Sequence, residues 1–188
     1  MRIIAGEFRG RALASVGKGD AGAHLRPTTD RVRESLFNVL SHQIDFDGLR
    51  VLDLFAGTGA LGLEALSRGA DHITFVDDGR VAQGLIRKNI DLTRSSDRTD
   101  LIRRDATRLG ENPNAPYDLI FLDPPYGKSL GQRALAKASE AGWIAEGAYI
   151  VWEENAPMQV PDGFQLLDSR KYGDTHISLM LQSLDHMG

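Results

Sequence analysis

A short apolar stretch followed by a glycine-rich turn and a helix constrains the fold of this chain more than any other feature. Residues 49–55 are apolar except for Arg50 and Asp53, residues 56–62 contain three glycines, and a helix-forming stretch begins at Leu63. Later stretches repeat the alternation of strand and helix, which is typical of a parallel sheet with helices on its faces. The sequence therefore predicts an α/β fold.

The predicted sheet has seven strands. Five of them alternate with helices, and the last two are joined tightly through Gly173-Asp174, so they should pair antiparallel. The predicted strands are residues 49–55, 72–77, 99–104, 117–122, 148–153, 164–172 and 175–181, and the predicted helices are residues 26–42, 63 onward, 81–94 and 130–141. This pattern predicts a doubly wound, mostly parallel seven-stranded sheet with an antiparallel terminal hairpin. Residues 2–14 are expected to add a small N-terminal β-hairpin.

The glycines Gly57-x-Gly59-x-x-Gly62 match the fingerprint of nucleotide-cofactor sites. Glycine lets the backbone approach a ligand, and Asp77, at the end of the second strand, is placed to accept hydrogen bonds from two ribose hydroxyls. Several nucleoside cofactors use this arrangement. Asp53 adds a negative charge at the end of the first strand, which is unfavourable beside a pyrophosphate and favourable near an ammonium and a sulfonium. The pattern therefore favours S-adenosylmethionine over a nicotinamide dinucleotide.

The stretch Asp123-Pro124-Pro125-Tyr126 follows the fourth predicted strand. Two prolines cannot continue a strand ladder, so a carboxylate, a stiff turn and an aromatic ring stand at the carboxyl end of a central strand, where such sheets bind ligands. The exocyclic amine of a nucleobase is a poor nucleophile, because its lone pair is delocalised into the ring. Asp123 and the Pro124 carbonyl can accept from its two N–H bonds, and Tyr126 can stack on the base. The alternative is a turn in which Asp123 only caps the next helix.

Three further residues have two interpretations each. Asp105, which with Ala106 ends the third strand, either accepts from an adenine N6 amine or caps a helix. Lys128, just after Tyr126, either meets a phosphate or is solvated. Phe37 borders the apolar face of the helix at residues 26–42, where core packing is favoured over contact with a ligand.

Composition excludes several classes of function. The chain has 188 residues, enough for one domain with a full core, and no cysteine, so disulfides, cysteine-ligated metals and cysteine nucleophiles are excluded. Its five histidines lack metal-ligand spacing, and we expect no metal. No apolar run approaches 18 residues and the start of the chain lacks a signal-peptide core, so we expect a cytoplasmic protein without a membrane span.

The charge distribution favours a nucleic-acid partner more than the net charge of −4 does. Residues 1–33 contain seven Lys and Arg against three acids, a net of +4. A basic segment on an acidic body is either a phosphate-binding surface or a solvated face, and the sequence leaves both possibilities open.

Together these features resemble the class I S-adenosylmethionine-dependent methyltransferases, and more narrowly the bacterial 16S ribosomal RNA guanine-N2 methyltransferase family. The resemblance covers nearly the whole chain. Its motifs are Arg2-x-Ile4-x-Gly6-x-x-Arg9-Gly10, the run at residues 26–38, the run at residues 52–65 and Asp123 to Tyr126. The last of these is shared with DNA adenine-N6 enzymes, and the two N-terminal motifs narrow the choice.

The resemblance implies a Rossmann-like methyltransferase fold and specific site residues. The cofactor S-adenosylmethionine would be held by Arg26, Thr28, Asp53, Phe55, Gly57, Gly59, Asp77, Asp105 and Ala106. The target guanine would be held by Asp123, Pro124, Pro125 and Tyr126, and RNA would be contacted by Arg2, Arg9, Arg11, Arg31 and Lys128. The implied domains are an RNA-binding β-hairpin extension at residues 1–25 and a methyltransferase domain at residues 26–188. The implied partner is 16S rRNA within the small ribosomal subunit, bound by a monomer.

Three other functions are compatible with parts of the sequence. A DNA adenine-N6 methyltransferase would keep the Asp123 loop, but the chain leaves no room for a separate target-recognition domain. A nicotinamide-dependent oxidoreductase is permitted by the glycines and disfavoured by Asp53. A non-enzymatic RNA-binding protein would have no need of the intact Asp123 loop.

Overall fold

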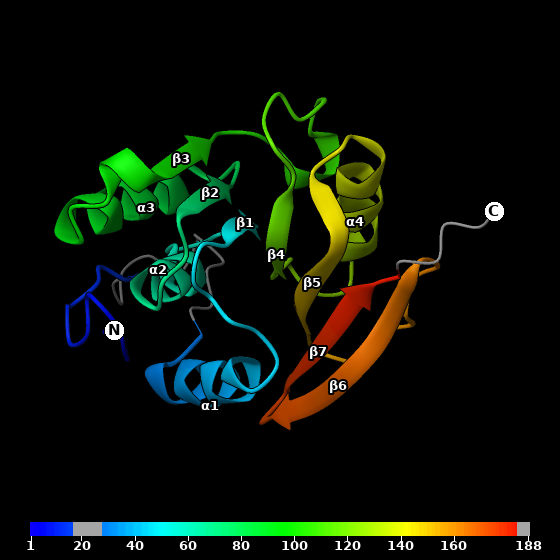
Figure 1. Ribbon diagram of the computed structural model, residues 1–188, viewed down its shortest axis with the longest axis horizontal. Coiled ribbons are helices and arrows are strands. Elements are labelled where there is room, and N and C mark those ends of the chain that lie inside the picture. The colour runs from blue at the N-terminus through cyan, green and yellow to red at the C-terminus, as the bar shows by residue number, and fades with distance from the viewer. Residues whose placement is uncertain (17–27, 184–188) are drawn as a thin grey trace.

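The computed structural model describes residues 1–16 and 28–183. These residues form one seven-stranded sheet in the order β3-β2-β1-β4-β5-β7-β6 (Figure 1). The strands are β1 Arg50–Leu54, β2 His72–Val76, β3 Thr99–Ile102, β4 Tyr117–Leu122, β5 Ile144–Glu154, β6 Phe164–Tyr172 and β7 Thr175–Gln182. Strands β1 to β5 pair in parallel, and β7 pairs antiparallel with both β5 and β6. The predicted, mostly parallel sheet with an antiparallel terminal hairpin is confirmed.

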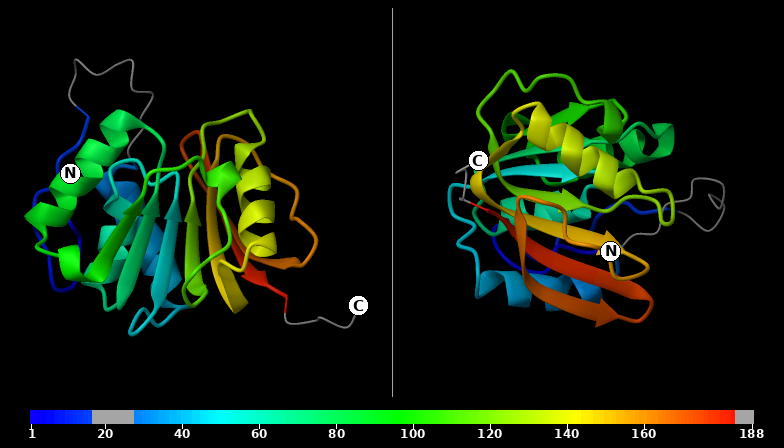
Figure 2. Two further views of the ribbon diagram at one scale, coloured as in Figure 1. Left: turned by 90° about the horizontal axis from the view of Figure 1, so that it is seen from above. Right: turned by 90° about the vertical axis from the view of Figure 1, so that its right-hand side faces the viewer.

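Helices cover both faces of this sheet. Helices α1 (Asp30–Ser41), α2 (Ala60–Ser67) and α3 (Arg80–Leu92) pack on one face, and α4 (Leu130–Glu140) packs on the other. The right-hand view of Figure 2 shows α1 and α4 on opposite sides of the strands. In β4, Leu119 and Phe121 join the core under the first three helices, and Ile120 and Leu122 join the core under α4. Apolar residues therefore fill both faces of the strand, as expected for a parallel strand buried on both sides.

Helix α1 begins with a side-chain cap. The hydroxyl of Thr29 accepts a hydrogen bond from the N–H of Val32 at 3.3 Å, and Asp30 stands in the first turn, where the helix dipole favours an acid. Phe37 is fully buried, with its ring centroid 5.5 Å from that of Phe46 and 5.9 Å from that of Phe121. Phe37 is thus a core residue, the favoured of its two interpretations.

At the predicted N-terminal β-hairpin, the chain pairs antiparallel through one bridge, Arg2 with Ala12, and through backbone hydrogen bonds from Leu13 to Met1 at 2.8 Å and from Ile3 to Arg11 at 3.0 Å, without forming regular strands. The backbone N–H groups of Ile4 and Ala5 donate to the carboxylate of Glu64 in α2, at 2.8 and 3.1 Å, and these bonds attach the segment to the helix. This segment, residues 1–16, is called the N-terminal segment below. The prediction of a hairpin missed these bonds because they join residues about 60 positions apart.

The N-terminal segment shares the core of the sheet. Ile3, Phe8 and Leu13 are buried in the cluster that also contains residues of α1, α2 and α3. Gly6 has a φ of +85°, and a Cβ there would overlap the carbonyl of Ser67 at the end of α2. The segment is held this close because glycine has no side chain. No helix within the described ranges is long and apolar enough to cross a membrane.

Candidate active site

A cleft of about 680 Å³ opens where β1, β2 and β4 end. Its walls are the glycine turn after β1, the turn after β2, the loop after β4 and Thr28, which precedes α1. Of the residues predicted for the site, the cleft brings together Thr28, Asp53, Phe55, Gly57, Asp77, Asp123, Pro124, Pro125, Tyr126 and Lys128. Segments far apart in the sequence therefore meet at the sheet edge where parallel α/β folds bind their ligands.

The glycine turn is shaped for close approach. Gly57 and Gly59 have φ angles of +60° and +81°, and Phe55, which precedes them, has a φ of +58°. A positive φ at a bulky residue is strained, and such strain is concentrated at functional sites. A Cβ on Gly62 would lie 2.7 Å from the ring of Phe75, so helix α2 can pack on β2 only with glycine at that position. The local backbone therefore needs the glycines that the motif supplies.

Asp53 and Asp77 form the β1–β2 side of the cleft. Asp53 is buried and accepts a hydrogen bond from the N–H of Gly62 at 3.2 Å. Burial raises the pKa of Asp53 well above its ordinary range, and the bond from Gly62 offsets only part of this. Asp77 accepts from the N–H groups of Gly57 and Gly79 at 3.0 and 2.8 Å, and burial nevertheless raises its pKa as well.

The hydrogen bonds and acids of the cleft indicate which kind of cofactor fits it. The N–H of Gly57, which would face a phosphate in a pyrophosphate site, donates to Asp77 instead. Asp53, Asp77 and Asp123 all line the same cleft, so the site gathers negative charge. Such a site suits a nucleoside that carries a positive charge and repels a pyrophosphate.

Asp123 forms the opposite side of the cleft, at the end of β4. Pro124 is buried, Pro125 is exposed and Tyr126 is half-buried, so the loop turns from the core to the surface within a few residues. Part of Asp123 is reached from the cleft, but most of its surroundings are protein. Burial, followed by the charges of Glu153 and Asp53, raises the pKa of Asp123 well above its ordinary range.

Glu153 is the partner that the sequence analysis did not identify. It stands near the end of β5, is 8% exposed, and forms a side-chain hydrogen bond with Asp123. Its Oε2 accepts a hydrogen bond from the hydroxyl of Thr28 at 3.1 Å. One signal was available: Glu153 ends the predicted strand at residues 148–153, and β5 is the parallel neighbour of β4, so its end must lie beside Asp123.

Three of the predicted cofactor residues do not line the cleft, and a fourth is not among the described residues. Arg26 falls outside the described residues, and Gly59 supports the turn without lining the cleft. The Oδ1 of Asp105 accepts from the N–H and the hydroxyl of Thr107 at 2.9 and 2.7 Å, which is the capping role that the sequence left open. Ala106 is buried in the α4-side core. Contacts of Asp105 and Ala106 with an adenine stay predictions.

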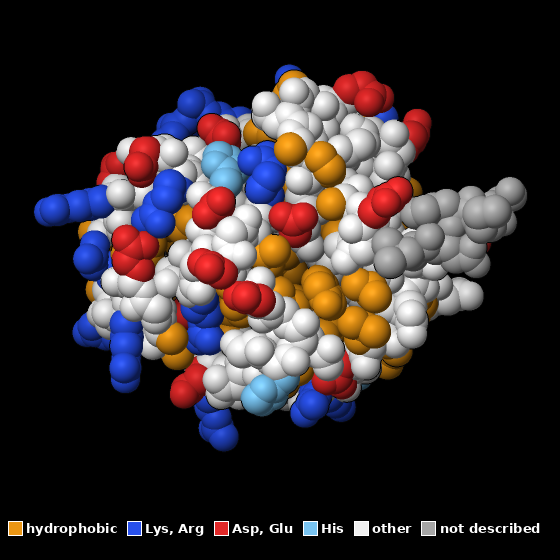
Figure 3. Space-filling model, viewed as in Figure 1, with side chains coloured by type: hydrophobic (Ala, Val, Ile, Leu, Met, Phe, Trp, Pro, Cys, Tyr) orange, Lys and Arg blue, Asp and Glu red, His pale blue; other side chains and the backbone are white. Residues whose placement is uncertain are grey.

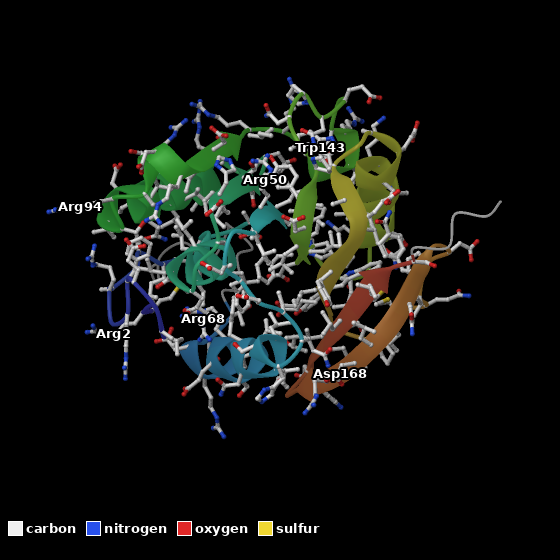
Figure 4. The ribbon with its side chains drawn as sticks, in the orientation of Figure 1. Arg2, Arg50, Arg68, Arg94, Trp143 and Asp168 are labelled. Atoms are coloured by element: carbon white, nitrogen blue, oxygen red, sulfur yellow. The ribbon has the colours of Figure 1, made fainter. Side chains whose placement is uncertain are left out.

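The predicted RNA-binding arginines are on the surface. Arg2, Arg9, Arg11 and Arg31 are exposed, and Arg11 donates to the carbonyl of Leu92 at the end of α3 at 2.6 Å. Figure 4 shows Arg2 and Arg94 on the same side of the molecule, where the N-terminal segment meets the end of α3. In Figure 3, Lys and Arg side chains gather along this rim and over α1, while acids lie nearer the centre of that face.

The N-terminal segment is also tied to the glycine turn. The buried side chain of Asn89 in α3 accepts from the N–H of Ala14 at 2.6 Å and donates to the carbonyls of Ala14 and Thr58 at 3.0 and 2.8 Å. Thr58 lies between the two glycines of the turn and lines the cleft. A single amide thus connects the basic segment with the candidate cofactor site.

Comparison with known proteins shows the family of the chain. The family model described as "Conserved hypothetical protein 95" matches residues 1–181. The chain is 36% identical to ribosomal RNA small subunit methyltransferase D of Haemophilus influenzae, over 92% of this chain and 89% of that protein, and 38% identical to the Escherichia coli K12 protein of the same name, over 88% and 82%. The solved structure of yhhF from Escherichia coli superposes with a TM-score of 0.83 at 33% identity, covering 97% of this chain and 98% of that one. The chain therefore belongs to the Conserved hypothetical protein 95 family, among the class I S-adenosylmethionine-dependent methyltransferases.

Proposed function

We propose that this protein transfers a methyl group from S-adenosylmethionine to the N2 amine of a guanine in 16S ribosomal RNA. The observation that carries the proposal is the meeting of Asp123 and Pro124 with Asp53 and Asp77 in one cleft. The first pair supplies acceptors for an amine, and the second pair supplies acceptors for a charged nucleoside. Two relatives that are 36% and 38% identical to this chain are named as small-subunit ribosomal RNA methyltransferases, which supports ribosomal RNA as the substrate.

The β1–β2 side would hold the cofactor. Asp53 and Gly57 would hold its methionine part, with Gly59 supporting the turn beneath it. Asp77 would hold its ribose hydroxyls, because a carboxylate fixed by two backbone N–H groups still has lone pairs to offer. The cofactor supplies an electrophilic methyl group. The chain contributes a negative site that favours the cationic form of the cofactor and a turn that admits it closely.

The β4 side would hold the guanine. The carboxyl of Asp123 and the carbonyl of Pro124 would accept the two N–H bonds of the N2 amine and draw its lone pair out of the ring. Tyr126 would stack on the base, and the stiff Pro124-Pro125 turn would keep the acceptors at fixed positions. The base must leave its stack to enter, since a stacked guanine cannot present this amine to a buried cleft.

The N-terminal segment would contribute to RNA binding. We assign residues 1–25 to an RNA-binding extension and residues 26–188 to the methyltransferase domain, with contacts to phosphates from Arg2, Arg9, Arg11, Arg31 and Lys128. The exposure of these five side chains supports the assignment, since phosphate contacts need accessible cations. We further propose that the protein acts as a monomer, in the cytoplasm, where small ribosomal subunits are made.

The test is to identify the methylated nucleoside. The protein is incubated with methyl-labelled S-adenosylmethionine and small ribosomal subunits that lack the modification, and the RNA is then digested to nucleosides. Label in N2-methylguanosine is the expected result. Label in N6-methyladenosine would replace the guanine by an adenine and keep the Asp123 chemistry. The absence of label in subunits, naked RNA and DNA would overturn the proposal.

A further inference from the structure

Asp123 and Glu153 directly follow the register pair Leu122–Trp152 of the neighbouring parallel strands β4 and β5, so their side chains lie side by side on one face of the sheet, where they form a hydrogen bond. The hydroxyl of Thr28 donates to Glu153 Oε2 at 3.1 Å. Two buried carboxylates in contact repel each other unless one proton lies between them. The arrangement therefore calls for a proton shared by the pair.

The support of this pair extends further into the protein. Arg33 Nε donates to the carbonyl of Thr28 at 3.4 Å, and the same fully buried guanidinium pairs with Asp30 and with Glu64 in α2. Thr28 is thus held at its backbone by Arg33 while its hydroxyl holds Glu153. Because Thr28 is hydrogen-bonded through both its backbone and its side chain, it fixes the position of the Glu153 carboxyl group.

We propose that Glu153 is a positioning residue for methyl transfer, which shares one proton with Asp123 and thereby presents the other Asp123 oxygen to the target amine. The proposal rests on the proposed function, because it takes Asp123 as the acceptor for that amine. It extends that function by adding Glu153, with Thr28 as its anchor, to the residues that determine turnover.

The proton balance of the pair suits the reaction. Before methyl transfer, the pair holds one proton and one negative charge. The methylated amine holds one proton too many, so an N–H bond breaks and an O–H bond forms on the cleft-facing oxygen of Asp123. The amine is then neutral, and the pair holds two protons and no charge. One proton passes to water when the product leaves, which restores the starting state.

The other charges around the pair act in the same direction. Asp53 from β1 and Glu154 from β5 are both negative, and after burial and the charge of Glu153 they contribute to the raised pKa of Asp123. The cleft is also lined by Asp77, Asp78, Arg80 and Lys128, of which Arg80 is the first residue of α3 and Lys128 stands on the loop that follows β4. The acids nearest the pair thus favour retention of the shared proton at neutral pH.

The experiment compares Glu153→Gln with Glu154→Gln in the full chain. Both changes remove one carboxylate from adjacent residues of β5, but Glu154 accepts its hydrogen bond from the indole N–H of Trp152, at 3.3 Å. For Glu153→Gln we expect kcat to fall by about 10-fold to 100-fold, less than the loss of a group that itself exchanges the proton. The dissociation constant of S-adenosylmethionine, measured by calorimetry, should stay within about twofold, since Glu153 supports the amine side of the cleft. Glu154→Gln removes only the weakest of the charges that act on Asp123 and no hydrogen bond of the pair, so it should lower kcat much less than Glu153→Gln does.

The pH dependence distinguishes proton sharing from shape alone. In the wild-type protein kcat should fall as rising pH removes the shared proton, whereas in Glu153→Gln this alkaline limb should shift to lower pH, because Asp123 loses its proton more easily without the charge of Glu153 beside it. Infrared absorption of protonated carboxyl groups in the cofactor-free protein gives a second readout. A band that titrates away as the pH rises should be present in the wild type and in Glu154→Gln, and weaker in Glu153→Gln.

Two results would overturn the inference: a Glu153→Gln protein with wild-type kcat and an unchanged alkaline limb, or equal infrared titrations in all three proteins. A wild-type protein that methylates nothing would instead contradict the proposed function, and the infrared titration would still decide whether the proton is shared. If Glu153→Gln does not fold, Thr28→Val and Thr28→Ser replace it. Serine, which keeps the hydroxyl, should recover turnover that valine loses, and equal turnover would count against the anchor.

Discussion

The two sides of the cleft hold their carboxylates in different ways. On the β1–β2 side, backbone N–H groups from the loops that follow the strands donate to the acids, Gly62 to Asp53 and Gly57 to Asp77. On the β4–β5 side, two carboxyl groups face each other, and the hydrogen bond comes from a side chain at the other end of the sequence. The first side is built by local backbone geometry, and the second by tertiary packing.

The difference corresponds to what each side has to do. Backbone donors do not titrate and hold the carboxyl groups of Asp53 and Asp77 in fixed positions, so the β1–β2 side keeps acceptors of the kind needed to hold a cationic ligand in place. A pair of carboxyl groups can take up and release a proton, so the β4–β5 side suits a group that loses one during the reaction. We therefore expect mutations on the two sides to affect different constants, cofactor affinity on the first and kcat on the second.

The largest effect is expected for Asp123→Ala. Removal of the acceptor for the target amine should lower kcat by about 100-fold to 1,000-fold, the range seen when one group that stabilises developing charge is removed. Cofactor affinity measured by calorimetry should change little, since Asp123 lies across the cleft from Asp53 and Asp77. An equal loss of affinity and turnover would show that the two sides are not separate.

The converse effect is expected for Asp77→Asn. An amide has only one acceptor oxygen, so it cannot accept from both Gly57 and Gly79, and it loses the charge that attracts the cofactor. Affinity for S-adenosylmethionine should fall by about 10-fold or more, the cost of one charge-assisted hydrogen bond. Turnover at saturating cofactor should fall much less. A loss of kcat without a loss of affinity would contradict the assignment of cofactor binding to the β1–β2 side.

The same contrast explains how much the sequence could predict. Asp53, the glycine turn and Asp77 lie within 25 residues, each next to the end of a strand, so their meeting follows once the strands are recognised. The Asp123 loop was predictable for the same reason. Glu153 also ends a predicted strand, but it was missed because the sequence around it does not show its partners, which are Asp123 on the adjacent strand and Thr28, 125 residues away.

The N-terminal segment likewise makes contacts with distant residues that its sequence does not predict. Its glycines and apolar positions correctly predicted turns and buried side chains, such as Ile3 and Phe8. Its antiparallel pairing is limited to the bridge between Arg2 and Ala12 and the hydrogen bonds beside it, and the bonds from the N–H groups of Ile4 and Ala5 to the carboxylate of Glu64 were not predicted. A glutamate in the middle of a predicted helix gives no sign that it is fully buried and bound to another segment. Sequence patterns predict local structure well, and they predict poorly which side chain from a distant element will meet it.

A glycine pair tests the packing beneath the β1–β2 side. Gly62→Ala should lower the free energy of unfolding by about 1 to 3 kcal/mol, because its Cβ would press on Phe75 and Ile73 beneath the turn. Gly84→Ala in α3 is the control, since a Cβ at that position would have no atom within 4 Å, and alanine there should stabilise the helix by up to about 1 kcal/mol. Urea unfolding measures both. Equal changes in stability would mean that helix propensity outweighs packing at Gly62.

The smallest effect is expected in the stability of Glu153→Gln and concerns its pH dependence. Burial and the charge of Glu153 raise the pKa of Asp123 in the folded state, so its contribution to stability is full below the unfolded pKa of about 4 and is lost as the pH rises through the folded pKa. Glutamine removes the facing charge and should stabilise the fold by about 1 kcal/mol near pH 8, with little effect near pH 4. Urea unfolding at the two pH values checks this, with Glu154→Gln as the control. A gain of equal size at both pH values would point to improved packing and not to relief of repulsion. If Glu153→Gln gains stability only at high pH and also loses kcat, then the wild-type pair of Asp123 and Glu153 is less stable than it could be, and it holds a proton where the reaction needs one.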